Sequence, residues 1–143
     1  MGQKINPIAF RLGVNKGWDS IWFAKKKEFG KYLIEDFKIR KYIQKNILNS
    51  GVSDIIIERS GKKLIVSIHT SRPGFVIGKK GADIEKIKSN VLKISKDSEV
   101  TINIKEIKKP ELNSYLVAEN IATQLVKRIA YRRAIKRGMQ SAM

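Results

Sequence analysis

The chain has 143 residues, with 30 Lys or Arg against 13 Asp or Glu, so its formal net charge is +17. It has no cysteine and a single histidine, His69, which excludes disulfide scaffolds, thiolate metal sites, cysteine nucleophiles and histidine-rich metal sites. No apolar run approaches the about 20 residues needed to span a bilayer, and residues 1–7 lack the apolar core of a secretory signal. We therefore expect a soluble, intracellular protein without a membrane partner.

The positive charge is distributed along the whole chain. Basic clusters occur at residues 25–27, 62–63, 79–80, 108–109 and 127–137. A protein that lies on a membrane would concentrate its cations in one amphipathic helix or beside a lipid anchor. A distributed charge instead suits an extended nucleic-acid backbone, and a net charge of about 2–8 would suffice for solubility alone. The charge pattern therefore predicts a nucleic acid as the partner.

The first half of the chain predicts an irregular segment, a helix and a β-hairpin. Residues 1–30 contain glycines and a proline without a repeating apolar pattern, so we expect them to be irregular. Asp36 is the candidate N-cap of a helix that ends before Gly51, and isoleucine repeats within it at positions 39, 43 and 47. Residues 54–59 and 64–70 are rich in β-branched side chains and flank a short turn, which indicates a hairpin.

The second half predicts a short helix, a glycine loop, a second helix, a strand and a long helix. The sequence Arg72-Pro73-Gly74 ends the preceding strand. Apolar residues then recur at helical spacing at Ile84, Ile87, Val91 and Ile94. Residues 100–104 alternate between apolar and polar side chains, as in a strand with one buried face. After Pro110 a helical pattern runs from about residue 111 to 136.

These elements predict an α+β fold in which helices cover one face of a small sheet. We expect three parts along the chain. They are an irregular N-terminal extension at residues 1–30, a domain at residues 31–107, and a helical segment at residues 108–143 that opens a second domain.

The motif Gly78-Lys79-Lys80-Gly81 joins the short helix to the second helix. Glycine lacks the Cβ atom that would hold a sugar-phosphate backbone at a distance, and it permits a positive φ. The first turn of the next helix offers N–H groups to phosphate, and the two lysines add an attraction that does not depend on base sequence. Two glycines at this spacing are common, whereas the pattern V-I-G-K-K-G-x-x-I-x-x-I is much more specific. A solvated turn is the other interpretation of the lysines.

This pattern resembles the KH family of RNA-binding domains, in which a G-x-x-G loop clamps about four nucleotides of a single strand. The order of helices and strands resembles the type II arrangement, which implies a three-stranded mixed sheet with helices on one face. The resemblance also implies that bases lie between Ile84 and Ile87 on one side and an edge strand at residues 64–68 on the other, with Ile77 as a further contact. Ile84 and Ile87 are equally consistent with plain core packing.

A second resemblance runs from Met1 almost to the last residue. Motifs in order and at compatible spacing match the S-three family of small-subunit ribosomal proteins, of the bacterial type. They are Met1-Gly2-Gln3-Lys4-Ile5-Asn6-Pro7, Arg11-Leu12-Gly13, Trp22-Phe23-Ala24, Ile68-His69-Thr70, Arg72-Pro73-Gly74 and Lys109-Pro110-Glu111-Leu112.

This resemblance implies a structural protein of the small-subunit head that binds ribosomal RNA, with Lys4, Arg11 and Arg72 among the RNA contacts. It also implies three further partners: messenger RNA and the small-subunit proteins ten and fourteen. The expected location is the ribosome, in the cytoplasm or in an organelle. No metal or cofactor is expected.

The last helical stretch changes character along its length. An apolar stripe covers its first half, at Val117, Ile121, Leu125 and Ile129. Arg128, Arg132 and Lys136 then project from the same side, and a helix that faces a core does not bury three cations. Either the helix bends after about Val126, or its end leaves the core and projects toward phosphate. A solvated run of charge is the third interpretation.

In the S-three family, the residues that correspond to Arg132, Arg133 and Lys136 lie where messenger RNA enters the subunit, which implies that these three contact it. Arginine suits bidentate phosphate contact, and lysine supplies a point charge. Family members continue past the position of Met143 into a second α+β domain. We therefore expect an incomplete chain, a split gene product or a fragment.

Several other residues have two interpretations. Trp18, Trp22 and Phe23 lie near lysines and are able to stack on unpaired bases, but a small local core is favoured. A hydrogen-bonded structural role suits His69, and helix capping explains Asp83.

Two other functions remain open beside the ribosomal one. The first is a free KH-domain protein that acts as an RNA chaperone or regulator. The second, remote one is a nuclease that holds a divalent metal through carboxylates such as Asp83. No nucleophile, base and oxyanion donors occur together, so we expect no enzyme.

Overall fold

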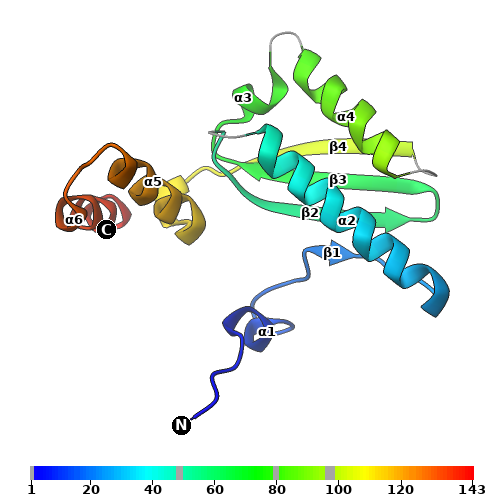
Figure 1. Ribbon diagram of the computed structural model, residues 1–143, viewed down its shortest axis with the longest axis horizontal. Coiled ribbons are helices and arrows are strands. Elements are labelled where there is room, and N and C mark those ends of the chain that lie inside the picture. The colour runs from blue at the N-terminus through cyan, green and yellow to red at the C-terminus, as the bar shows by residue number, and fades with distance from the viewer. Residues whose placement is uncertain (1, 48–49, 79–80, 96–98) are drawn as a thin grey trace.

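The computed structural model describes residues 2–47, 50–78, 81–95 and 99–143 (Figure 1). Its strands form one mixed sheet in the order β1-β2-β3-β4. They are β1 (Ser20–Ile21), β2 (Val52–Ser60), β3 (Lys63–Thr70) and β4 (Glu99–Glu106). The central strands β2 and β3 are antiparallel, whereas β1 runs parallel to β2 and β4 runs parallel to β3.

Helices cover one face of this sheet, and the predicted α+β class is confirmed. In Figure 1, α2 crosses in front of the strands, and α3 and α4 lie along the β4 side of the sheet, above it in the view. The helices are α1 (Pro7–Arg11), α2 (Lys26–Asn46), α3 (Pro73–Ile77), α4 (Ala82–Ile94), the 3₁₀ helix η2 (Pro110–Leu112), α5 (Ser114–Val126) and α6 (Tyr131–Ala142).

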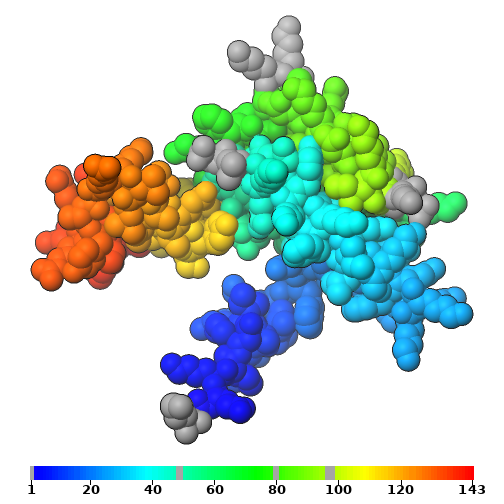
Figure 2. Space-filling view, in the orientation of Figure 1, coloured from blue at the N-terminus to red at the C-terminus, as the bar shows by residue number. Residues whose placement is uncertain are grey.

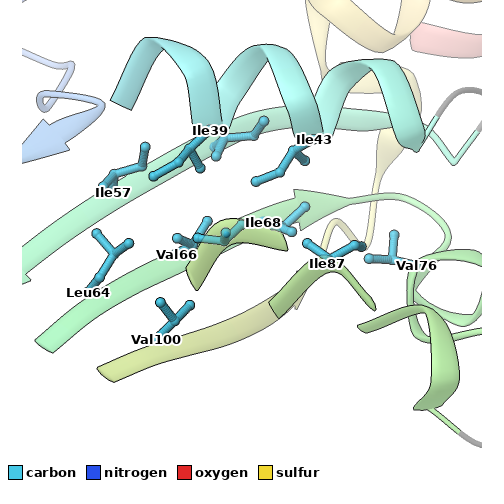
Figure 3. Close-up of a cluster of buried hydrophobic side chains, with 11 residues drawn as sticks. Ile39, Ile43, Ile57, Leu64, Val66, Ile68, Val76, Ile87 and Val100 are labelled. Carbon is cyan, nitrogen blue, oxygen red and sulfur yellow. The ribbon is translucent and has the colours of Figure 1, made fainter. Parts of the chain in front are cut away.

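The hydrophobic core lies between the sheet and helices α2 and α4. Alternate strand residues point toward the helices, because side chains in a strand alternate between its two faces. The strand residues in the core are Ile55 and Ile57 of β2, Leu64, Val66 and Ile68 of β3, and Val100 of β4. The predicted isoleucine repeat of α2 packs on them through Ile39 and Ile43, and α4 contributes Ile87 (Figure 3).

The predicted β-hairpin is confirmed as β2 and β3. Ser60 pairs with Lys63, so Gly61 and Lys62 form the turn. Gly61 has a positive φ of 60°, as two-residue hairpin turns commonly require. The short helix, the second helix and the following strand are also present, as α3, α4 and β4.

The sheet has one strand more than the three that were expected. The additional strand, β1, contains two residues and is too short to show an alternating pattern in the sequence. Residues 1–30 are also more regular than expected. The side chain of Asn6 caps α1 by accepting hydrogen bonds from the N–H groups of Ile8 and Ala9, and α2 already begins at Lys26.

The expected N-cap at Asp36 is wrong, because this residue lies inside α2 and is only 2% exposed. Its carboxylate accepts hydrogen bonds from Arg59 at 2.6 Å, from Ser20 Oγ at 2.9 Å and from Trp22 Nε1 at 2.7 Å. Arg59 also pairs with Glu35 at 3.0 Å. A buried acid with such partners joins α2 to the sheet, and in the sequence it resembles a cap.

The expected helix at residues 111–136 is wrong, because this stretch forms η2, α5 and α6. Asn113 caps α5 through its side chain, which accepts hydrogen bonds from two backbone N–H groups. After Val126 the chain leaves the helix, and Arg128 has a φ of 62°, in the left-handed region that a right-handed helix excludes. A bend after about Val126 was one of the two structural explanations for the basic residues on the apolar side. It is confirmed, and the helix does not only bend there but ends.

Helices α5 and α6 pack on each other and on η2, and α5 also contacts β2. Leu116 of α5 is 8% exposed and lies close to Gly51 at the start of β2. Figure 2 shows these helices as a lobe beside the main body, in orange and red, and the segment before β1 as a blue arm that projects from it.

Among the helices of the described residues, none combines the length and the apolar composition that crossing a bilayer requires.

Candidate nucleic-acid interface

Gly78 ends α3 in a conformation that other residues rarely adopt. Its φ is 70° and its ψ is −177°, and its N–H donates a hydrogen bond to the Gly74 carbonyl at 3.0 Å. A Cβ atom here would lie 2.0 Å from Oδ2 of Asp83, so the Asp83 side chain fills the space that a larger residue would need. Both the backbone angles and the packing therefore require glycine at this end of the motif.

Gly81 forms the other end of the motif and is the N-cap of α4. Its φ of 80° and ψ of 4° lie in the left-handed region, and a Cβ atom here would meet nothing within 4 Å. Glycine brings no side chain to cap the helix, so no N-cap side chain occupies the positive end of the α4 dipole, where phosphate binds. Lys79 and Lys80, which the sequence places between the two glycines, lie outside the described residues.

Acidic groups lie on one side of this turn. Asp83 and Glu85 belong to the first turn of α4, where carboxylates interact favourably with the helix dipole. Lys86 Nζ lies 3.5 Å from Asp83 Oδ1, and both side chains are more than half exposed. Such a surface pair contributes little stability. The main structural contact of Asp83 is therefore its packing against Gly78.

The apolar residues beside the motif differ in exposure. Ile87 is 5% exposed and belongs to the core, so the packing interpretation of this residue is confirmed. Ile84 is half-buried, and Ile77 at the end of α3 is 39% exposed, so both remain accessible. Phe75 of α3 is 70% exposed and was not predicted as a site residue. The signal was its place in the apolar run before Gly78, where only Val76 is buried.

The strand beside these residues is β4 and not the strand at residues 64–68. That segment belongs to β3, which lies between β2 and β4, so the expected edge strand is wrong. Both α3 and α4 contact β4, and β4 forms the free edge of the sheet on this side. The error arises because strand order depends on tertiary packing, whereas the sequence shows only that the segment forms a strand.

The other predicted RNA contacts lie at separate places. Arg72 is exposed at the N-cap of α3, close to the motif, and also lines a groove of about 590 Å³ between the end of β3 and the α5–α6 lobe. Lys4 and Arg11 are exposed on the N-terminal arm, which Figure 1 shows beyond β1, at the sheet edge opposite β4. The structure therefore places Arg72 at the opposite end of α3 from Gly78 and leaves Lys4 and Arg11 on the N-terminal arm.

Helix α6 presents a basic face. Ala134 is fully buried against the lobe, and a Cβ atom on Gly138 would lie 3.4 Å from Ile121 of α5, so this pair marks the packed side of α6. At 100° per residue, Arg132, Arg133 and Lys136 project from the opposite side, and all three are exposed. The structure thus brings these three predicted residues together on one open surface.

The tryptophans and Phe23 divide between two environments. Trp22 packs against Phe29 and Tyr32, with ring centroids 5.4 Å and 5.7 Å apart, and its hydrogen bond to Asp36 holds it in place. The local-core interpretation is therefore confirmed for Trp22. Trp18 and Phe23 are 66% and 94% exposed, so they do not belong to that core.

His69 lies on the face of β3 away from the helices, in register with Asp54 of β2 and Lys105 of β4. It is half-buried, and within the described ranges its Nε2 atom has no hydrogen-bond partner. The hydrogen-bonded role expected for His69 is therefore not seen at this atom. In the part of the chain that the structure describes, no three His, Asp or Glu side chains cluster as metal ligands would.

Comparison with known proteins adds a family assignment to this geometry. The family model of the KH domain matches residues 38–112. The small ribosomal subunit protein uS3 of Pelagibacter ubique is 71% identical over all 143 residues, which cover 63% of that protein. The uS3 of Parvibaculum lavamentivorans is 58% identical with 60% covered, and that of Methylacidiphilum infernorum is 53% identical with 67% covered. The chain thus matches these relatives along its whole length and spans about 60% of the first of them.

Proposed function

Since this chain belongs to the KH-domain family and to the uS3 family of small-ribosomal-subunit proteins, we propose that it is a structural, non-catalytic constituent of the small subunit. In this role it binds ribosomal RNA and supports translation in the cytoplasm. Small-subunit proteins ten and fourteen are its proposed protein neighbours. The proposed division is a KH domain at residues 31–107, preceded by the N-terminal extension and followed by the start of a second domain.

The observation that carries the RNA-binding proposal is the geometry of the two motif glycines. Both have a positive φ, and Gly81 places the open N-terminus of α4 at the turn. A sugar-phosphate backbone approaches such a turn closely because no Cβ atom intervenes. The helix dipole then favours the phosphate, and Lys79 and Lys80 supply the positive charge. The proposed clamp thus holds the backbone of a single strand and leaves its bases free.

The bases of the clamped strand then meet the apolar surface beside the motif. Ile77 and Ile84 are accessible there, and Phe75 offers an exposed ring. Stacking on an aromatic ring is worth about 1–3 kcal/mol per base and tolerates any base. The strand that bounds this surface is β4, since α3 and α4 rest on it.

A second RNA surface is proposed on α6. Arg132, Arg133 and Lys136 share one exposed face of this helix. The break after Val126 gives α6 its own direction, so its basic face is independent of the apolar stripe of α5. We assign this face to incoming messenger RNA, with the arginines as bidentate phosphate ligands.

The clamp is tested by the double variant Lys79→Asp/Lys80→Asp. A single-stranded RNA of about four nucleotides, the length that such loops hold, should bind about tenfold more weakly or worse, while the melting temperature stays unchanged. The matched control is Lys38→Asp/Lys41→Asp, which makes the same change in charge on an exposed part of α2. Fluorescence anisotropy measures both affinities. If the affinity falls equally in the two variants, the loss is a general effect of charge and the proposed clamp is wrong.

Association with the particle separates a ribosomal constituent from a free RNA chaperone. The chain should sediment with small subunits and remain with them through a high-salt wash, because many simultaneous contacts resist screening better than one clamp does. Release of the whole protein at moderate salt would favour the chaperone.

A further inference from the structure

A pocket of about 340 Å³ lies at the end of the KH fold away from the glycine motif. The motif precedes the first residue of α4, whereas this pocket includes Ser95, which follows the last. A helix of 13 residues is about 20 Å long, so the two places are well separated. In Figure 1 the β2–β3 turn, the end of α4 and the start of α2 gather on the right of the view.

Aromatic and cationic side chains line this pocket together. Its aromatic and basic residues are Phe23, Lys25, Tyr32, Arg59 and Lys62. Phe23 is 94% exposed, so its ring is open to a ligand on the rim. The side chain of Arg59 is 9% exposed, and within the described residues its Nε atom has no hydrogen-bond partner. The pocket thus has an open stacking surface, two lysines and an unsatisfied buried donor.

The acids in the same pocket lower its positive charge. Glu35 pairs with Arg59 at 3.0 Å, and Arg59 also pairs with Asp36 at 2.6 Å, so these three side chains together carry one negative charge. Glu28, in the first turn of α2, is the other acid in the lining. The guanidinium of Arg59 lies 4.5 Å from the centre of the Tyr32 ring and occupies one face of it, which leaves Phe23 as the free aromatic surface.

We propose that this pocket is a second RNA site that takes one unpaired nucleotide of the strand. The base stacks on Phe23, and Lys25 and Lys62 hold the adjoining phosphates. The volume lies at the lower end of the about 300–1,000 Å³ typical of small-molecule sites, which suits a single nucleotide and excludes a helical partner. The inference rests on the proposed RNA-binding function and extends it to a place that the motif does not reach.

An RNA strand that occupies both sites should bind with an affinity that depends on its length. An oligouridine of about four nucleotides occupies the clamp alone, whereas one of about 12 nucleotides is able to reach both sites and gains affinity through the second contact. Phe23→Ala should remove this gain, weakening the longer RNA by about fivefold or more and leaving the shorter one unchanged. Because Phe23 is almost fully exposed, its truncation should leave the melting temperature unchanged.

The matched control is Phe37→Ala, which removes another exposed ring, 66% accessible, from a part of α2 outside the pocket. It should keep the full gain of the longer RNA. If Phe23→Ala keeps that gain as well, the proposed site is wrong.

A direct readout is photocrosslinking of 4-thiouridine RNA followed by peptide mass spectrometry. Adducts on Phe23 or Tyr32 are expected with the longer RNA and should be lost in Lys25→Asp/Lys62→Asp. If a poly-glutamate peptide protects these residues while RNA leaves no adduct, the pocket belongs to an acidic protein partner and the inference fails. The Lys79→Asp/Lys80→Asp variant separates the two proposals, since failure of the clamp alone leaves the adducts at Phe23 in place.

Discussion

Gly78 combines a φ of 70° with a ψ of −177°, a region of backbone space that is essentially restricted to glycine. Gly81, with a φ of 80° and a ψ of 4°, lies where other residues fit at a cost of about 1 kcal/mol. Gly78→Ala should therefore lower the free energy of unfolding by about 2–3 kcal/mol, and Gly81→Ala by about 1 kcal/mol. Urea denaturation of the two variants measures this difference.

The contact with Asp83 separates the two causes at Gly78. Asp83→Ala removes the Oδ2 and Cγ atoms that a new Cβ atom would meet at 2.0 and 2.6 Å, and keeps the Asp83 Cβ atom at 2.8 Å. Gly78→Ala should then be less destabilising in the Asp83→Ala background than in the natural chain. Equal losses in both backgrounds would mean that the Asp83 carboxylate contributes nothing to the effect.

The buried carboxylate of Asp36 makes a second prediction at the residue scale. Asp36→Ala removes a partner of Arg59 and the acceptor for Ser20 and Trp22. Breaking a buried pair costs about 3–5 kcal/mol, and the loss should be near 3 kcal/mol because Glu35 still pairs with Arg59.

The control for Asp36 is Glu99→Ala. It breaks the exposed pair with Lys63 at 3.5 Å and should cost less than about 1 kcal/mol. Denaturation curves compare both variants, and similar losses would mean that burial of the Asp36 pair has no energetic effect.

Among single residues, the roles of some were predictable from the sequence and the roles of others were not. The glycine motif was predictable because glycine and lysine carry their conformational freedom and charge in any context. The role of Asp36 was not predictable. A carboxylate before an apolar repeat is typical of a helix N-cap, and only the fold shows that its partner is the distant Arg59. Phe75 was missed because only the fold shows that Val76 is the inward residue of that run.

Among the elements, those with a clear apolar period were predicted well. Strand β4 alternates and α4 repeats at helical spacing, so the side of each that faces the core was readable. Strands β2 and β3 were recognised from their β-branched composition, which does not show which side faces the core. The two-residue strand β1 is too short for a period. The residue with left-handed backbone angles between α5 and α6 is Arg128. Glycine is the usual residue at such a helix end, so the usual signal was absent from the sequence.

The contact between α5 and α6 supports a prediction at the element scale. A Cβ atom on Gly138 would lie 3.4 Å from Ile121 and 3.5 Å from Val117, which is ordinary contact. Gly138→Ala should stabilise the chain by about 0.5–1 kcal/mol, because glycine is less favourable than alanine within a helix. Gly138→Leu should instead destabilise it by about 1–3 kcal/mol through overpacking, as thermal unfolding would show.

Limited trypsin digestion supplies the structural readout for this pair of variants. Cleavage after Arg128 should accelerate in Gly138→Leu, since the two helices separate there, and should slow in Gly138→Ala. Gln140→Leu is the control, because it places the same apolar side chain at an exposed position of the same helix. Faster cleavage in that control would mean that a leucine on α6 acts without contact to α5.

For the whole molecule, the exposed basic groups lie on separate surfaces, and the proposed RNA contacts should therefore be separable. Replacing Arg132, Arg133 and Lys136 together by alanine removes three charge-assisted contacts of about 1 kcal/mol or more each. Binding of an unstructured, message-like RNA should weaken by about a hundredfold or more. Binding of a ribosomal RNA fragment that the glycine motif holds should change little, as filter binding of the two RNAs would show.

The control for this prediction is alanine replacement of Lys38, Lys41 and Lys45, which are exposed on α2. It removes the same charge from another place and should affect both RNAs slightly and equally. An equal loss for both RNAs in the α6 variant would mean that the two surfaces act as one.

Strands β3 and β4 run parallel, so the chain between them crosses over the sheet, and α3, the glycine motif and α4 all belong to that crossover. A chain that grows from its N-terminus completes β3 before any of these parts exists. Both helices contact β4, so part of their support is absent until that last strand has joined. The proposed RNA clamp should therefore be complete in a nascent domain only after translation has passed Glu106.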